Sequence, residues 1–358
     1  MKEIINHFFY YEYIYIFLFS SIIFLFLSVF VKKNIIKKIA LPLFSIFFVL
    51  FCFEFGLSFS MEKIELSIGN DNLINLSDKQ LNQRHEIKIK SKIDGTTKFI
   101  NTESYDIKLY EKVYDAFYSA YHNCFRYVKC DISSVDTYVF LGCSFTFGDG
   151  LNDNETLPYY FSKLYNFEKN IINCAVSGKS TNTVFSVLNN EMFLPLIKNE
   201  KSKIKHFFYF VMRDHIARNF RITNPSDIEI YKNQKWYIPT IIGKIKYIFA
   251  RSYIFRKVLV PVIDECFKQY YEDYMIKSLK EINRIVEEKY NSKLAVIIWE
   301  KEWYREYFIK KLKETKLDLI FLPEYFVFEE EGYRIKNDGH PTAKANKEVA
   351  EILYNHIK

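Results

Sequence analysis

Residues 139–148 read Val-Phe-Leu-Gly-Cys-Ser-Phe-Thr-Phe-Gly, and this stretch decides how the rest of the chain is interpreted. An apolar run ends at Gly142, a turn follows, and Ser144 stands where a strand gives way to a helix. A turn of small residues exposes a serine hydroxyl to a base and to backbone N–H donors, which a serine nucleophile needs. A serine after a strand is on its own more often a helix cap, so a catalytic role requires a partner.

A candidate partner lies near the C-terminus, where residues 337–342 read Asn-Asp-Gly-His-Pro-Thr directly before a last helical pattern. His340 is the usual type of general base near neutral pH, and Asp338 can hold its tautomer and orient its ring. The alternative is a helix-entry turn that carries a surface histidine.

The chain between these segments alternates between strand and helix patterns. The strand-like runs are 137–141, 170–174, 206–212, 293–299 and 318–322, and the helical patterns are 155–165, 181–192, 264–290, 302–313 and 343–356. Such alternation predicts an α/β fold, here a flavodoxin-like three-layer sandwich with a five-stranded parallel sheet. Sheets of this kind bind ligands at the carboxyl ends of their strands, where Ser144 is expected.

Together the two segments resemble the first and last sequence blocks of the SGNH (GDSL-like) hydrolase superfamily, G-D-S-x-x-x-G and D-x-x-H-P. Residues 173–178, Asn-Cys-Ala-Val-Ser-Gly, resemble the family's glycine block, and residues 213–215 occupy the place of its asparagine block. The resemblance covers about residues 136–357, with the blocks in family order.

The resemblance implies a role for each matching position. The catalytic residues would be Ser144, His340 and Asp338, and the oxyanion hole would use Gly178 and Arg213. The chain departs from the family pattern at three points. Cys143 replaces the usual Asp, Arg213 replaces the usual Asn, and the carboxylate precedes His340 by two residues rather than three.

Two further residues in this region, His215 and Arg218, either contact the substrate or serve the fold, and the sequence favours neither. No metal or cofactor is implied by the resemblance. Cys143 is not expected to be the nucleophile, because its side chain should point away from that of Ser144.

The N-terminal region carries two apolar runs, residues 8–31 and 39–61, joined by a loop that holds four lysines. Each run is long enough to span a hydrocarbon core of about 30 Å. Cationic loops stay in the cytoplasm, so we expect two transmembrane helices in the cytoplasmic membrane with everything after Met61 outside it. The alternative is a buried helical hairpin of a soluble protein.

These patterns divide the chain into a membrane anchor at 1–61, a membrane-proximal segment at 62–135 and a catalytic domain at 136–358. The middle segment has an alternating stretch at 85–89 and a predicted helix at 109–121. A basic and aromatic insertion at about 223–263 is either an ordinary packed insertion or a cap that faces the site or the membrane.

The composition narrows the function classes. The formal charge is +7, but the lysines are spread along the chain and no nucleic-acid-binding motif occurs, so nucleic acid is not an expected partner. The six cysteines include no CxxC pair, which disfavours metal or thioredoxin-type chemistry. Cys124 and Cys130 are either bridged or free.

The sequence therefore predicts an extracytoplasmic serine esterase or O-acyltransferase that acts on acyl esters of cell-surface glycans. Envelope polysaccharide-assembly proteins are its expected partners. Two alternatives stay open: a lysophospholipase or thioesterase that hydrolyses a lipid ester, and a non-catalytic module of the same fold in an envelope assembly.

Overall fold

The computed structural model describes residues 22–23, 42–45, 48, 82–93, 95, 97–100, 106–121, 125–218, 260–299, 306–328 and 330–358. The chain divides into two compact units, residues 1–73 with 221–269 and residues 74–220 with 270–358. The second unit holds the fold described below. Apart from a few residues, the two predicted transmembrane runs and the insertion lie outside the described residues. Within the described ranges, no helix is both long and apolar enough to cross a bilayer.

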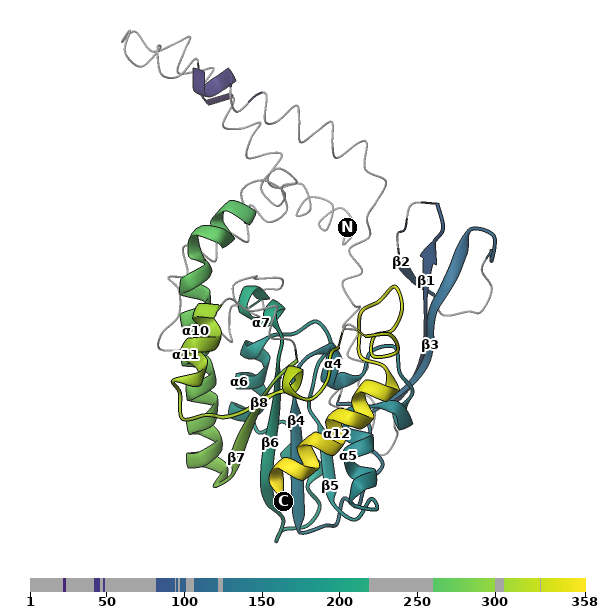
Figure 1. Cartoon of the computed structure of the whole chain (residues 1–358), viewed down its shortest axis with the longest axis vertical. Helices are drawn as coiled ribbons and strands as arrows, with labels where there is room; N and C mark the ends of the chain where they lie inside the picture. The colour runs from purple at the N-terminus through teal and green to yellow at the C-terminus, as the bar shows by residue number, and fades with distance from the viewer. Residues whose placement is uncertain are drawn as a thin grey trace. The chain divides into compact units, whose positions relative to one another are not determined.

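The core of this unit is a five-stranded sheet in which every neighbouring pair of strands is parallel (Figure 1). Across the sheet the strands are β5 (Asn170–Asn173), β4 (Asp136–Leu141), β6 (Lys203–Val211), β7 (Lys293–Ile298) and β8 (Asp318–Phe321). Counted along the chain this order is 2-1-3-4-5, the flavodoxin-like order. The predicted fold class and parallel sheet are confirmed, and the five predicted strands occur with ends displaced by a few residues.

The strands are nearly continuous apolar runs because helices cover both faces of the sheet. On one face, α5 (Leu157–Leu164) and α12 (Ala343–Ile357) pack into a core that includes Phe140 and Phe208. On the other face, the Tyr290 ring of α10 (Val260–Tyr290) lies 5.3 Å from the Phe207 ring.

Two more helices cover that second face, α6 (Thr181–Asn189) and α11 (Glu306–Lys313). The Thr181 hydroxyl lies 2.8 Å from that of Tyr209 on β6, and Tyr307 donates to Asp273 of α10 at 2.7 Å. Two short helices, α4 (Ser144–Phe147) and α7 (Arg213–Arg218), follow β4 and β6 directly, so both begin at the carboxyl edge of the sheet.

A second, antiparallel sheet precedes the parallel one along the chain, and we call it the small sheet. Its strands are β2 (Thr97–Ile100), β1 (Asn82–Ser91) and β3 (Tyr110–Ala120), in that order across the sheet. The helix predicted at 109–121 is wrong, because Tyr114, Ala116 and Tyr118 are buried alternately, and a repeat of two residues belongs to a strand. The alternation seen at 85–89 is part of β1.

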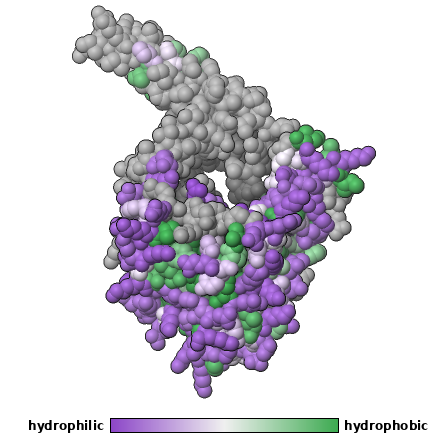
Figure 2. All heavy atoms as spheres, in the orientation of Figure 1, coloured by the Kyte–Doolittle hydropathy of each residue, from purple (hydrophilic) through white to green (hydrophobic). Residues whose placement is uncertain are grey.

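The small sheet leans on the parallel-sheet domain through one face. Asn152 and Asp153, which lie a few residues beyond α4, accept hydrogen bonds from the backbone N–H groups of Phe117 and Ser119 at 3.1 Å. The outer end of the sheet is exposed: Figure 2 shows apolar side chains there, and Ile93 and Ile107 are 80% and 71% exposed, whereas Ile87 and Ile89 of β1 are buried.

Candidate active site

Residues 142–149 follow β4 and include α4, and we call them the nucleophile turn after the predicted role of Ser144, the first residue of that helix. Gly142 is required by close approach, because a Cβ at this position would collide with Oγ1 of Thr146. The Ser144 hydroxyl lies 3.9 Å from the Cys143 sulfur. Cys143 is the N-cap of the helix but makes no side-chain capping bond, and the described residues offer no acceptor for the Ser144 N–H.

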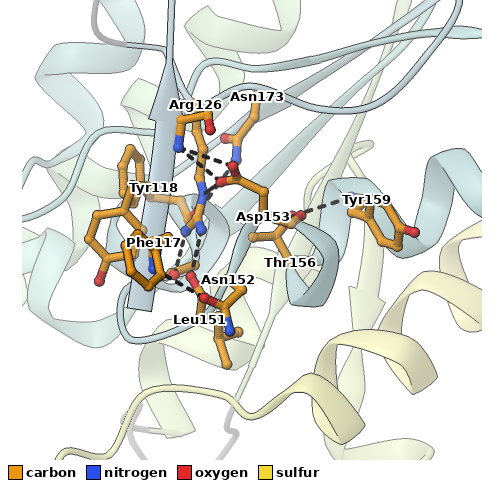
Figure 3. Close-up of polar contacts among 12 residues, drawn as sticks. Phe117, Tyr118, Arg126, Leu151, Asn152, Asp153, Thr156, Tyr159 and Asn173 are labelled. Atoms are coloured by element: carbon orange, nitrogen blue, oxygen red, sulfur yellow. Dashed lines mark hydrogen bonds and ion pairs between the residues drawn. The ribbon is translucent and has the colours of Figure 1, made fainter. Parts of the chain in front are cut away.

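A buried arginine braces this turn from the far end of α4 (Figure 3). The guanidinium of Arg126 donates to the carbonyl oxygens of Phe147, Gly148 and Leu151 at 3.1, 2.6 and 2.5 Å. Its Nε donates to Asp153 at 3.1 Å, and the residue has no exposed surface. These bonds fix the C-terminal end of α4 and the turn that follows it, and the Leu151 carbonyl has no other donor among the described residues.

The loop after β5 is fastened to the nucleophile turn by its backbone. The Val176 N–H donates to the carbonyl oxygen of Gly142 at 3.2 Å, and Gly178 follows two residues later with a φ of +72°. A Cβ on Gly178 would meet nothing within 4 Å, so its backbone borders open space. Like that of Ser144, the Gly178 N–H has no acceptor in the described ranges.

The loop that carries His340 reaches the same end of the sheet. The His340 ring packs on Phe145, with 5.3 Å between ring centroids. Its Nε2 lies 4.0 Å from a carboxylate oxygen of Asp149, whose backbone N–H donates to the Ser144 carbonyl at 3.1 Å. The structure therefore brings His340 to the nucleophile turn. The structure describes both side chains and shows no hydrogen bond between the Ser144 hydroxyl and the His340 ring.

Asp338 holds the other nitrogen of the His340 ring. One of its carboxylate oxygens is hydrogen-bonded to His340 Nδ1 and the other to Nζ of Lys88, and its side chain has no exposed surface. Burial alone would raise the pKa of Asp338, but the hydrogen bonds and charges of His340 and Lys88 hold it at about 2. Asp338 is thus a carboxylate at neutral pH, and Lys88 comes from β1 of the small sheet.

Asp149 lies on the Nε2 side of the same ring. The Ser177 hydroxyl donates to its carboxylate at 2.5 Å, which links the glycine loop to the nucleophile turn. Burial raises the pKa of Asp149, while the charge of His340 and the hydrogen bond from Ser177 act in the opposite direction. His340 is therefore flanked by two carboxyl groups.

The predicted residues of α7 separate into two groups. Arg213 is exposed and makes no polar contact with the described residues, and Arg218 is ion-paired with Asp214 at 2.9 Å. His215 is completely buried: its Nδ1 lies 3.1 Å from the Tyr209 hydroxyl, and burial lowers its pKa to about 3. His215 is consequently a neutral residue inside the fold, so its burial favours the structural alternative over substrate contact.

Cys130, Cys143 and Cys174 carry free thiols. Cys143 is 1% exposed, and burial raises the pKa of its thiol. A buried thiol that resists ionisation is a poor nucleophile, in agreement with the expectation that Ser144 acts instead. Cys124 lies outside the described residues.

Sequence patterns missed Lys88, Arg126 and Asp149. Lys88 and Arg126 lie in the segment that carries no recognisable motif, and Lys88 is 250 positions away from Asp338. Asp149 lies one residue beyond the quoted nucleophile block, so the block itself indicated where to look for it.

Comparison with known proteins gave matches only among solved structures. No family model matches the chain, and no curated protein matches it. One solved structure is TesA, 12% identical, which aligns with 62% of this chain and 98% of its own at a TM-score of 0.37. The esterase EstA from Pseudoalteromonas sp. has the same identity and TM-score and covers 62% of this chain and 96% of its own. Axe2, an acetylxylan esterase from Geobacillus stearothermophilus, is 11% identical and covers 63% of this chain and 95% of its own, at a TM-score of 0.35.

Proposed function

We propose that this chain is a serine enzyme acting on ester bonds, with Ser144 as its nucleophile and His340 as its general base. The observation that carries the proposal is the His340 ring. Its Nδ1 is held by a buried carboxylate, and its Nε2 is left on the side of the nucleophile turn. A base whose tautomer is fixed in this way and whose second nitrogen faces a serine turn is the arrangement that serine hydrolases use.

In the proposed reaction, His340 Nε2 takes the proton of the Ser144 hydroxyl as its oxygen attacks an ester carbonyl. The N–H groups of Ser144 and Gly178, for which the described part of the chain offers no acceptor, donate to the oxyanion that develops. His340 then gives the proton to the departing alcohol, and water or an acceptor hydroxyl releases the acyl group from Ser144. Closing the distance between Ser144 Oγ and His340 Nε2 belongs to substrate binding, because catalytic hydrogen bonds often tighten in the complex.

The substrate class that we propose is an acyl ester of a cell-surface glycan, processed by hydrolysis or by transfer to a sugar hydroxyl. The sequence supports this choice through the two apolar runs and the lysine-rich loop between them, which favour an outward-facing domain. A lipid ester is the competing substrate. A non-catalytic module is the competing class, supported by the absence of the family's asparagine at Arg213.

A fluorophosphonate probe on the full chain tests the catalytic role directly. We expect the probe to label Ser144 in the wild type and to label the Cys143→Ala variant equally well. The Cys143 thiol is buried beside Ser144 and takes no part in the reaction with the probe. Ser144→Ala should lose the label entirely. Wild type that is folded but unlabelled would favour the non-catalytic module. Incubation with an acyl donor, with and without glycan, then separates hydrolysis from transfer.

A further inference from the structure

The small sheet places an ammonium group inside the candidate active site. Lys88 is the middle member of a row, Glu86, Lys88 and Lys90, on one face of β1, and it pairs across the sheet with Tyr114. Its side chain is only 15% exposed, and Nζ lies 5.5 Å from the centre of the Phe99 ring and 5.8 Å from that of Tyr114. A lysine in such a position is held in one place by its aromatic neighbours.

The partner of this ammonium group is the carboxylate that holds the His340 ring. Lys88 and His340 bind different oxygens of Asp338, so the three side chains form a continuous Lys–Asp–His chain. Next to it, Lys90 donates to Asn337 Oδ1 at 2.9 Å. The small sheet thus contacts two successive residues of the loop before His340.

The effect of a buried carboxylate on a neighbouring histidine depends on whether a cation also binds the carboxylate. Alone, the Asp338 charge would stabilise the protonated His340 ring, and a ring that keeps its proton cannot accept one from Ser144. A cation on the second oxygen offsets part of that charge. It also fixes the carboxylate, which has no exposed surface from which water could hold it.

We propose that Lys88 is a positioning residue for the Asp338–His340 pair, so that the small sheet forms part of the catalytic machinery rather than a passive lead-in. This inference rests on the proposed function of Ser144 and His340. Lys88 acts through Asp338 and does not contact the reacting atoms. Its charge opposes the effect of the Asp338 and Asp149 carboxyl groups on the His340 ring, and its position fixes the Asp338 carboxylate that orients the ring.

The test is the pH dependence of Ser144 labelling by the fluorophosphonate probe, measured on the full chain. In Lys88→Met we expect the acidic limb of the profile to move up by about one pH unit, which lowers labelling on that limb about tenfold. Lys88→Arg keeps the charge and should restore the limb towards its wild-type position. Lys90→Met is the matched control, because it removes a neighbouring lysine that binds Asn337 instead, and it should leave the limb in place.

The outcomes separate the two proposals. Wild type that is never labelled contradicts the proposed function itself. Labelled wild type together with an unmoved limb in Lys88→Met overturns only the role of Lys88. If Lys88→Met does not fold, the double variant Lys88→Met/Asp338→Asn decides, because it removes both buried charges. Recovery of the fold supports charge compensation, whereas a double variant that also fails to fold means that Lys88 acts in packing alone.

Discussion

The nucleophile turn and the His340 loop meet at the same end of the parallel sheet, but different kinds of contact hold them. The turn is fixed mainly through its backbone, by the Arg126 guanidinium and by Val176 from the neighbouring loop. The His340 loop is held through side-chain charges, by Lys88 of the small sheet and by the Asp338 carboxylate that Lys88 binds. Damage to the first set of contacts should therefore unfold the domain, and damage to the second should change its chemistry.

The largest effect is expected at the nucleophile turn, from Arg126→Met. The substitution removes one donor from the carbonyl groups that Arg126 binds and leaves Asp153 without its ion-pair partner, and breaking a buried pair of this kind costs about 3–5 kcal/mol. Chemical denaturation of the full chain measures the loss. Arg284→Met is the matched control: Arg284 is an exposed arginine of α10 whose ion pairs with described residues lie along its own helix, and no measurable change is expected. Equal stabilities of the two variants would refute the bracing role of Arg126.

The contacts of the His340 loop should instead affect the stability of the fold at low pH. The pKa of Asp338 is about 2 in the folded chain and 3.8 when unperturbed, a lowered value. The stability it contributes is therefore fully present above about pH 4 and is lost as the pH falls through about 2. At about 1.36 kcal/mol per pKa unit this amounts to about 2 kcal/mol.

The measurement is the free energy of unfolding between pH 5 and pH 2, compared between wild type and Asp338→Asn. The variant's stability should fall less steeply in this window, by about 2 kcal/mol in total. Asp214→Asn serves as the control, because its ion pair with Arg218 is exposed and should leave the slope close to that of wild type. Parallel curves for wild type and Asp338→Asn would mean that Asp338 is not held as a carboxylate.

The same contrast explains how much of the molecule the sequence revealed. The strands of the parallel sheet are long apolar runs, and the nucleophile turn lies at the end of one, so local patterns predicted both. Lys88 and Arg126 acquire their roles only when the small sheet docks, through partners that are distant in the sequence. The wrong prediction of a helix at 109–121 has the same origin. The buried side chains of β3 alternate because one face of that strand packs on the catalytic domain, and the sequence of residues 109–121 alone does not indicate this contact.

The smallest effect is expected where the two regions touch, from Asp149→Asn. Asp149 belongs to the nucleophile turn, yet its carboxyl group lies 4.0 Å from His340 Nε2. Burial raises the pKa of Asp149, but whenever its carboxyl group is ionised it stabilises positive charge on the ring, and Asn does not. We expect the acidic limb of Ser144 labelling to move down by about half a pH unit, opposite in direction to the effect of Lys88→Met. The plateau should fall only a few-fold, because the protonated ring formed during attack loses one favourable charge.

Ser177→Ala is the matched control, since it removes the hydrogen bond to Asp149 but keeps the charge. An upward shift in Asp149→Asn would show that Asp149 and Asp338 do not act on the same ring from opposite sides.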